Sequence, residues 1–103
     1  MFDEMTKKYI QAAISSEKQN AIENYGLTYN SDHEAFAVLK EEVEETRDEQ
    51  IQVKNGLYKF WNEIKNNKNI DEKNIAFICE HAEKLALEAV QVAAVCKKIL
   101  NGI

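Results

Sequence analysis

The 103 residues of this chain carry a net charge of −5, and the lysines and arginines do not gather into a basic run. Nucleic acids and anionic lipid surfaces bind clustered positive charge, so the sequence argues against both as partners, whereas a divalent cation suits the charge. A hydrophobic content of 45% with 30% charged residues fits one folded domain over residues 1–103.

The location and assembly of the chain can also be predicted. It has no segment typical of a signal peptide and no long uncharged apolar run, so we expect a cytoplasmic protein that does not enter the membrane. Cys79 and Cys96 are expected to be small buried core residues, roughly 25 Å apart on one helix and therefore not bridged to each other. A chain this short leaves apolar surface uncovered, which predicts a homo-oligomer, with a homodimer as the first choice.

The chain is expected to be entirely helical, because it has no proline, only three glycines, and no apolar run with the alternation of a strand. Apolar residues from Phe2 to Tyr25 recur at spacings near three and four, and Gly26 is expected to end this first helix. Ser31 followed three residues later by Glu34 is a capping box, which predicts the start of a second helix.

The second helix is expected to continue through Ile64 to the polar stretch NNKN, a length of about thirty residues. Gly56 is its weak point, at a cost of roughly 1 kcal/mol relative to alanine. Asp71 is the expected N-cap of a third helix that reaches about Leu100 and ends at Asn-Gly. The sequence therefore predicts an all-α helical bundle of three long helices, with a short fourth helix at a terminus left open.

The sequence EEVEE places Glu41, Glu42, Glu44 and Glu45 within five positions of the second helix. On a helical wheel Glu42 points to the margin of the apolar face, where an unpaired carboxylate costs several kcal/mol. Glu42 and Glu45 are neighbours on adjacent turns and repel each other unless a cation lies between them. The pattern indicates a metal site, and a solvated helix face is the alternative.

The third helix contains the stretch LALEAVQVAAVC, from Leu85 to Cys96, in which Glu88 and Gln91 are the only polar residues. An E-x-x-E on one helix facing an E-x-x-Q on another offers four oxygen ligands, which suit Mg²⁺ or Mn²⁺. Two alternatives remain open: Glu88 is a buried carboxylate paired with Arg47 or a lysine, and Gln91 is a hydrogen-bonded core residue.

These two motifs carry a resemblance to a known family. EEVEE resembles the EExxE motif of the MazG-like nucleotide pyrophosphohydrolases, and EAVQVAAV is similar to the ExxD helix of that all-α superfamily, over roughly residues 33–100. The resemblance implies that Glu42, Glu45 and Glu88 bind Mg²⁺ together with Gln91, which stands at the position of the family's aspartate. It also implies that Glu41 activates water and that a nucleoside triphosphate is cleaved to the monophosphate and pyrophosphate.

Contacts to such a substrate can be assigned only as candidates. Arg47 and Lys54 are candidates to contact phosphate, and Trp61 is a candidate to stack on the base. Other aromatic candidates for the base are Phe60, Tyr58 and Tyr25. The pair formed by Phe60 and Trp61 is alternatively part of the core or of an oligomer interface.

A function from a different class competes with the enzyme. In it the chain is a catalytically silent helical module of the same fold that serves as an oligomeric binding or scaffold protein. Gln91 favours this alternative, because it replaces a charged ligand by a neutral one, and the gap from Glu45 to Glu88 is longer than is usual in the family. The retained Glu42, Glu45 and Glu88 favour the enzyme.

Overall fold

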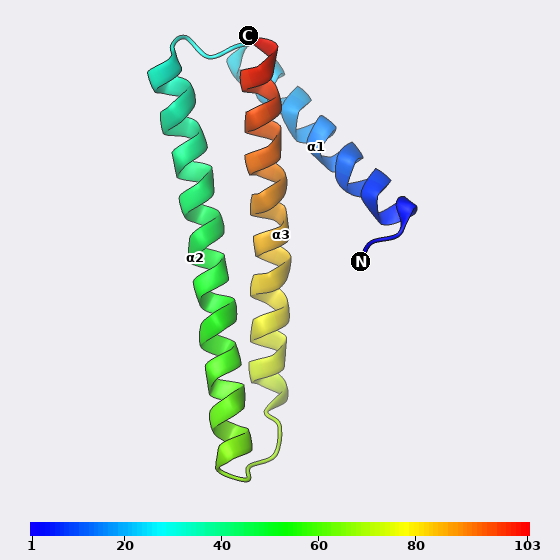
Figure 1. The fold of residues 1–103 in the computed structure, drawn as a ribbon, viewed down its shortest axis with the longest axis vertical. Helices are drawn as coiled ribbons and strands as arrows, with labels where there is room; N and C mark the ends of the chain where they lie inside the picture. Colours follow the sequence, from blue (N-terminus) through cyan, green and yellow to red (C-terminus); the bar gives the residue numbers. More distant parts are fainter.

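The computed structural model describes residues 1–103 as three α-helices joined by two short loops (Figure 1). α1 spans Glu4–Tyr25, α2 spans Asp32–Lys65 and α3 spans Glu72–Asn101, and there is no strand. The predicted all-α class with three long helices is confirmed, and no fourth helix is present at either terminus. None of the three helices combines the length and the apolar composition that a membrane-spanning segment requires.

α2 and α3 form the body of the molecule. They lie side by side as an antiparallel pair, and α1 packs against α3 alone, with its N-terminal part pointing away from the pair (Figure 1). The molecule is accordingly elongated, with extents of 56 × 32 × 21 Å. All three helices come together only near the end of α1, the beginning of α2 and the end of α3.

Local hydrogen bonds set the helix ends where the sequence predicted them. The Ser31 hydroxyl accepts from the Glu34 backbone N–H at 3.1 Å, and the Asp71 side chain caps α3 in the same way. The second half of the capping box does not form, because the Glu34 carboxylate accepts from Asn30 Nδ2 at 3.1 Å instead. Gly26 ends α1 with a φ of +95°, which residues with a side chain rarely adopt.

Gly56 lies at the closest approach of α2 to α3. A methyl group at this position would have its carbon 2.4 Å from Ile78 Cγ1, so only glycine lets the helices come so near. The Asn74 side-chain amide crosses the same contact and donates to the Gly56 carbonyl at 3.1 Å. The residue expected to weaken α2 is therefore the one that allows α3 to pack against it.

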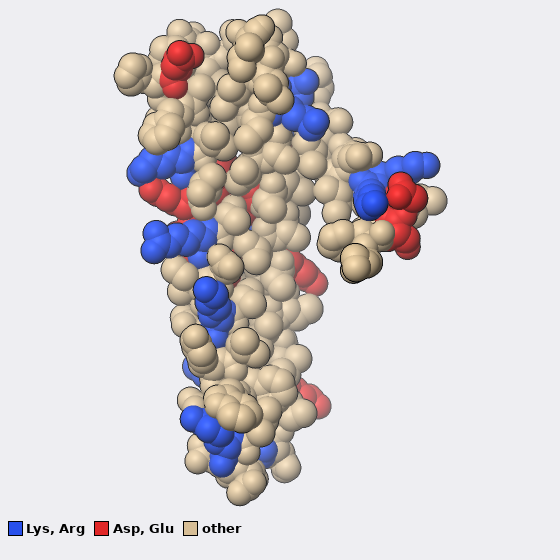
Figure 2. All heavy atoms as spheres, viewed as in Figure 1, with Lys and Arg blue, Asp and Glu red and all other residues tan.

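The single chain buries little of its own apolar surface. Ala94 and Val95 are its only buried hydrophobic side chains, and Leu57, Trp61 and Ile64 are exposed. The accessible surface is 7963 Å², compared with about 6,000 Å² for a compact monomer of this mass. The radius of gyration is 17.6 Å, compared with about 13 Å for a compact domain. Figure 2 shows scattered charged side chains on a face made mostly of uncharged residues.

Candidate metal centre

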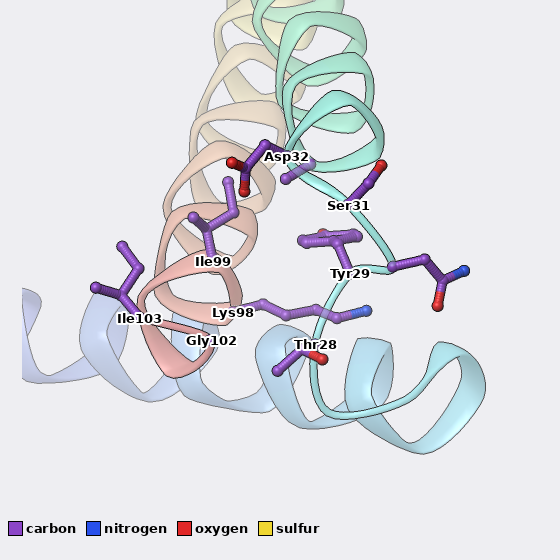
Figure 3. A pocket seen from close by; sticks show the side chains of 10 residues that line it. Thr28, Tyr29, Ser31, Asp32, Lys98, Ile99, Gly102 and Ile103 are labelled. Carbon is purple, nitrogen blue, oxygen red and sulfur yellow. The ribbon is translucent and has the colours of Figure 1, made fainter.

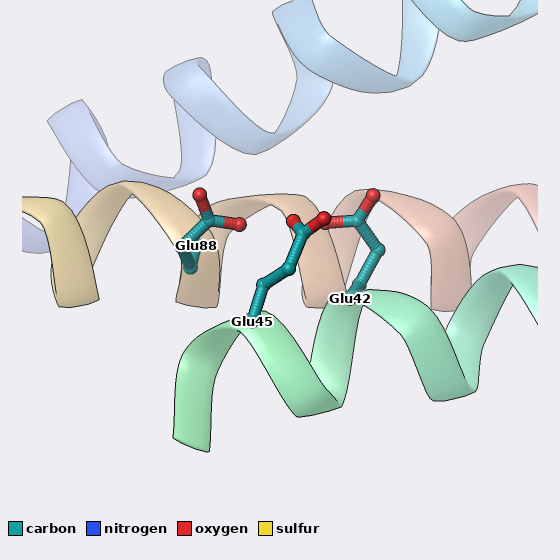
Figure 4. Close-up of side chains that lie close together, drawn as sticks. All are labelled: Glu42, Glu45 and Glu88. Atoms are coloured by element: carbon teal, nitrogen blue, oxygen red, sulfur yellow. The ribbon is translucent and has the colours of Figure 1, made fainter. Parts of the chain in front are cut away.

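Three carboxylates from α2 and α3 converge in the middle of the helix pair (Figure 4). One oxygen from each of Glu42, Glu45 and Glu88 lies within 4.8 Å of the other two. Glu42 and Glu45 are neighbours because three residues place them on adjacent turns of α2, and the antiparallel pairing puts Glu88 beside them. The predicted convergence is confirmed, although Glu45 and Glu88 are far apart in the sequence.

Glu42 has the one carboxylate oxygen of the cluster that is buried without a hydrogen-bond partner. Its Oε2 atom is buried and has no hydrogen-bond partner, which is true of no other buried side-chain nitrogen or oxygen in the chain. Burial raises the pKa of Glu42 above its ordinary value, and the charges of Glu45 and Glu41 raise it further. Both effects disfavour the ionised form of this carboxyl.

Glu88 responds in the same way from the opposite helix. Its pKa is raised by burial first and then by the Glu45 carboxyl, with smaller contributions from the charges of Glu42 and Glu49. The neighbouring carboxyl groups thus disfavour ionisation of Glu88, through a side-chain hydrogen bond with Glu45 and through their charges. A cation placed among them would lower these pKa values, because it favours the ionised form of each group.

The donor set fits a hard divalent cation. Carboxylate oxygens are the ligands that Mg²⁺ and Mn²⁺ prefer. Oxygens on a single Mg²⁺, at about 2.1 Å each, lie up to roughly 4.2 Å apart, so small side-chain rotations suffice to close a cluster whose oxygens lie within 4.8 Å. The unpartnered Glu42 oxygen adds a specific reason for a cation at this place.

Gln91 does not join the converging group. Its side-chain amide donates instead to Glu17 Oε2 on α1, at 2.9 Å. Gln91 lies one turn beyond Glu88, so this bond holds a fourth carboxylate close to the cluster, and Glu17, Glu88 and Gln91 line one cleft of about 410 Å³ between α1 and α3. The hydrogen bond agrees with the core role weighed for Gln91, and its role as a direct ligand stays a prediction.

A second cleft, which we call the three-helix cleft, opens beside Glu42 where all three helices meet. Its volume is about 360 Å³. Glu41 and Glu42 line it from α2, Gln91 and Lys98 from α3, and Tyr29 from the loop between α1 and α2. Glu41, the residue predicted to activate water, therefore faces the same space as Glu42.

The residues predicted to contact substrate lie elsewhere in the protomer. Arg47, Lys54 and Trp61 are exposed, and none of them lines either cleft beside the carboxylates. Trp61 is about 28 Å from Glu42 along α2 at 1.5 Å per residue. Arg47 is two residues after Glu45, so it points to nearly the opposite side of the helix. Within one protomer these three assignments find no support, and they stay predictions.

α3 also carries His81 and the two cysteines. His81 Nδ1 contacts Glu49 Oε2 at 2.5 Å across the α2–α3 interface, and the His81 ring packs against Phe77. His81 is thus engaged with a carboxylate on the neighbouring helix. The expectation of two buried cysteines is wrong for Cys79, which is exposed because it lies on the outer side of α3, whereas Cys96 is half-buried.

Three residues of this region were not singled out from the sequence. Glu17 lies four residues from both Ala13 and Ala21, and a carboxylate on such an apolar stripe is the same signal that pointed to Glu88. Tyr29 and Lys98 are brought together only by the fold, since no local pattern relates the first loop to the end of the third helix.

No protein-family model matches the chain, and no curated protein and no solved structure matches it either. The resemblance to the MazG-like family therefore rests on the two motifs alone. The fold and the carboxylate cluster define an all-α helical protein with a candidate site for a divalent cation.

Proposed function

We propose that the chain is a divalent-cation-dependent hydrolase that cleaves nucleoside triphosphates to the monophosphate and pyrophosphate. The observation that carries the proposal is the convergence of Glu42, Glu45 and Glu88, whose oxygens lie within 4.8 Å of one another. Nucleotide chemistry suits such a site because a triphosphate is too negative to approach bare carboxylates. The resemblance to the MazG-like family points to the same reaction.

In this proposal the residues of the site have two different roles, cation binding and proton transfer. Glu42, Glu45 and Glu88 would hold Mg²⁺ or Mn²⁺ between α2 and α3. When bound, such an ion would supply Lewis-acid chemistry: it would polarise a phosphoryl oxygen and lower the pKa of a coordinated water. Glu41, which lines the three-helix cleft next to Glu42, would accept a proton from an attacking water.

A panel of nucleoside triphosphates, assayed for pyrophosphate release with Mg²⁺, with Mn²⁺ and with a chelator, tests this function. We expect release with metal and none with chelator. Glu45→Gln removes one ligand charge and should reduce the rate at least about tenfold, which corresponds to 1.4 kcal/mol. Glu44→Gln is the matched control, because Glu44 is exposed and paired with Lys40 rather than with the cluster. Absence of release with every triphosphate and both ions would refute the proposal.

The competing function is a catalytically silent helical module that binds or scaffolds as an oligomer. It is favoured by Gln91, whose amide is occupied by Glu17 at 2.9 Å. A module of this kind would bind no triphosphate at the carboxylates, and Glu45→Gln would then leave its assembly unchanged.

We also propose that the protein is a homo-oligomer in the cytoplasm, with a dimer as the first choice. Its support is the exposed apolar surface of α2, including Leu57, Trp61 and Ile64, and an accessible surface well above that of a compact monomer. Light scattering should give a multiple of the 11.9 kDa chain mass. A monomer at micromolar concentration would refute the assembly, whatever the activity assay shows.

A further inference from the structure

Lys98 is the most deeply buried large side chain of the protein, with 1% of its surface exposed. Its Nζ lies 4.2 Å from the centre of the Tyr29 ring, and it takes part in no ion pair. Figure 3 shows the side chain leaving α3 and passing below the Tyr29 ring toward the loop. A buried ammonium group is costly unless it is compensated, and a contact with one aromatic ring offsets only part of that cost.

The three-helix cleft is lined by groups of both charges. The carboxylates of Glu34, Glu41 and Glu42 line it together with the side chain of Lys98. Lys98 is ten residues after Glu88 on α3, which corresponds to about 15 Å between their Cα atoms along the helix axis, and a lysine side chain can span part of that distance. Because Glu42 and Lys98 line the same cleft, a chain of phosphates whose first members lie at the carboxylates with their cation would extend toward Lys98.

We propose that Lys98 binds the terminal phosphate of the triphosphate substrate. The inference rests on the proposed function and extends it, because it makes Lys98 the residue that distinguishes triphosphates from diphosphates. Tyr29 positions the ammonium group by packing its ring against it. Burial raises the pKa of Tyr29, so the phenol stays protonated at neutral pH and adds no negative charge beside Lys98.

The positive charge of Lys98 would have a specific role in the cleavage reaction. Water attacks the α-phosphorus, a new P–O bond forms, and the bond from the α-phosphorus to the bridging oxygen breaks. Pyrophosphate leaves with that electron pair, while the proton of the water passes to a carboxylate and then to solvent. The negative charge gained by the leaving pyrophosphate forms on the former bridging oxygen and is shared over both of its phosphates, so an ammonium group of Lys98 on the terminal phosphate stabilises both the substrate tail and the departing product.

A structural role for Lys98 is the competing explanation. The carboxylates of Glu34 and Glu42 line the same cleft, and the carbonyl end of α3 favours a cation. In that case Lys98 balances charges within the folded chain and touches no substrate. Loss of its charge would then change stability without changing which nucleotide is preferred.

Lys98→Met tests the proposal, since methionine keeps an unbranched chain and removes the charge; Lys97→Met, at an exposed neighbour, is the control. A charged hydrogen bond to phosphate predicts a loss of about 10- to 100-fold in kcat/KM for triphosphates, with diphosphates nearly unaffected. Calorimetry with inorganic pyrophosphate and Mg²⁺ should show a similar loss of affinity, while Mn²⁺ binding is retained. Equal losses for both nucleotide classes, or unchanged pyrophosphate binding, would overturn the proposal.

A second measurement on the wild type covers the case in which Lys98→Met fails to fold. In the NMR spectrum of protein labelled with ¹⁵N-lysine, added pyrophosphate and Mg²⁺ should shift the side-chain signal of Lys98 and leave that of Lys97 in place. An unmoved Lys98 signal at saturating pyrophosphate refutes the inference. If the wild type hydrolyses no triphosphate but pyrophosphate shifts the Lys98 signal, the proposed function is refuted and the anion site at Lys98 is supported. If the wild type hydrolyses triphosphates but the Lys98 signal does not shift, the proposed function is supported and the role of Lys98 is refuted.

Discussion

The α2–α3 interface contains two buried polar contacts that differ in character. At Gly56 the carbonyl receives the Asn74 amide at 3.1 Å, and the helices approach as closely as a missing side chain permits. Further along the same interface, Glu42 Oε2 is buried without a donor, and Glu88 faces it with a raised pKa. Buried polar groups are normally paired, and an unpaired one costs free energy. The Gly56 contact therefore stabilises the fold. The carboxylate cluster destabilises it, and a bound cation would offset that cost.

The largest expected effect is that of a divalent cation on the cluster. At neutral pH, Mn²⁺ or Mg²⁺ at a hundred times its Kd should raise the free energy of unfolding by about 2.7 kcal/mol, since the ion binds only the folded state. Thermal melts with and without the ion measure this effect. Glu45→Gln should weaken the response, and Glu44→Gln should keep it. Equal melting temperatures of the wild type with and without the ion would mean that the carboxylate cluster binds no cation, and it would then not differ from the Gly56 contact in this respect.

Gln91→Asp should make the stability of the protein depend more strongly on the cation, although the expected change in stability is somewhat smaller than that caused by the ion in the wild type. The change removes the amide that donates to Glu17 and adds a carboxylate near Glu88. Without metal the protein should lose roughly 1–3 kcal/mol of stability, the cost of an uncompensated, partly buried polar group.

Added Mg²⁺ should recover most of that loss, because the new carboxylate supplies a fourth charged oxygen. Melts of wild type and Gln91→Asp, each with and without millimolar Mg²⁺, decide the point. The neutral variant Gln91→Asn is the control for loss of the Glu17 bond alone. If the melting temperature of Gln91→Asp is the same with and without Mg²⁺, Gln91 is a hydrogen-bonded core residue without a metal role.

Gly56→Ala tests the other contact. Overpacking against Ile78 should cost about 1–3 kcal/mol, and the better helix propensity of alanine should return about 1 kcal/mol of it. Urea denaturation should therefore report a net loss, with the response to Mn²⁺ unchanged. Asn55→Ala, at the exposed neighbouring position, controls for helix propensity. A stabilised Gly56→Ala protein would mean that α2 and α3 do not touch as described.

The smallest effect is the pH dependence of the metal-free protein. The folded-state pKa values of Glu42 and Glu88 lie above their ordinary value of 4.5, so the folded chain holds protons that the unfolded chain has released. These two groups should make the free energy of unfolding fall as the pH rises from 4.5 through the raised pKa values, and then level off. Partial exposure and salt keep the change small.

Urea denaturation in chelator, at a series of pH values, measures this dependence. The double variant Glu42→Gln/Glu88→Gln serves as the reference, because it keeps every other titrating group, including the pair of His81 and Glu49. The wild type should lose stability relative to the variant as the pH rises. A difference between the two proteins that stays flat with pH would contradict the electrostatic account of the cluster.

Local chemistry explains why much of the fold could be predicted. Ser31, Asp71 and Gly26 act within a few residues of themselves, so the helix ends follow from short-range hydrogen bonds and backbone preferences. Glu42 could be placed at the inner margin of α2 because helix periodicity fixes its direction. The facing of Glu42 and Glu88 followed from a simple requirement, since two carboxylates on apolar faces need a shared partner.

By itself the sequence determined three helices and their boundaries, because each depends on residues within a few turns of one helix. It also predicted that the two carboxylate motifs face each other, because both need a shared partner. Only the tertiary structure decided that Gly56 is a close contact, that Gln91 binds Glu17, and that Lys98 lies beneath Tyr29. These contacts join residues from different elements, and their geometry depends on how α1, the loop after it and α2 pack against α3. No local pattern specifies this packing, because it is set by whole helix faces.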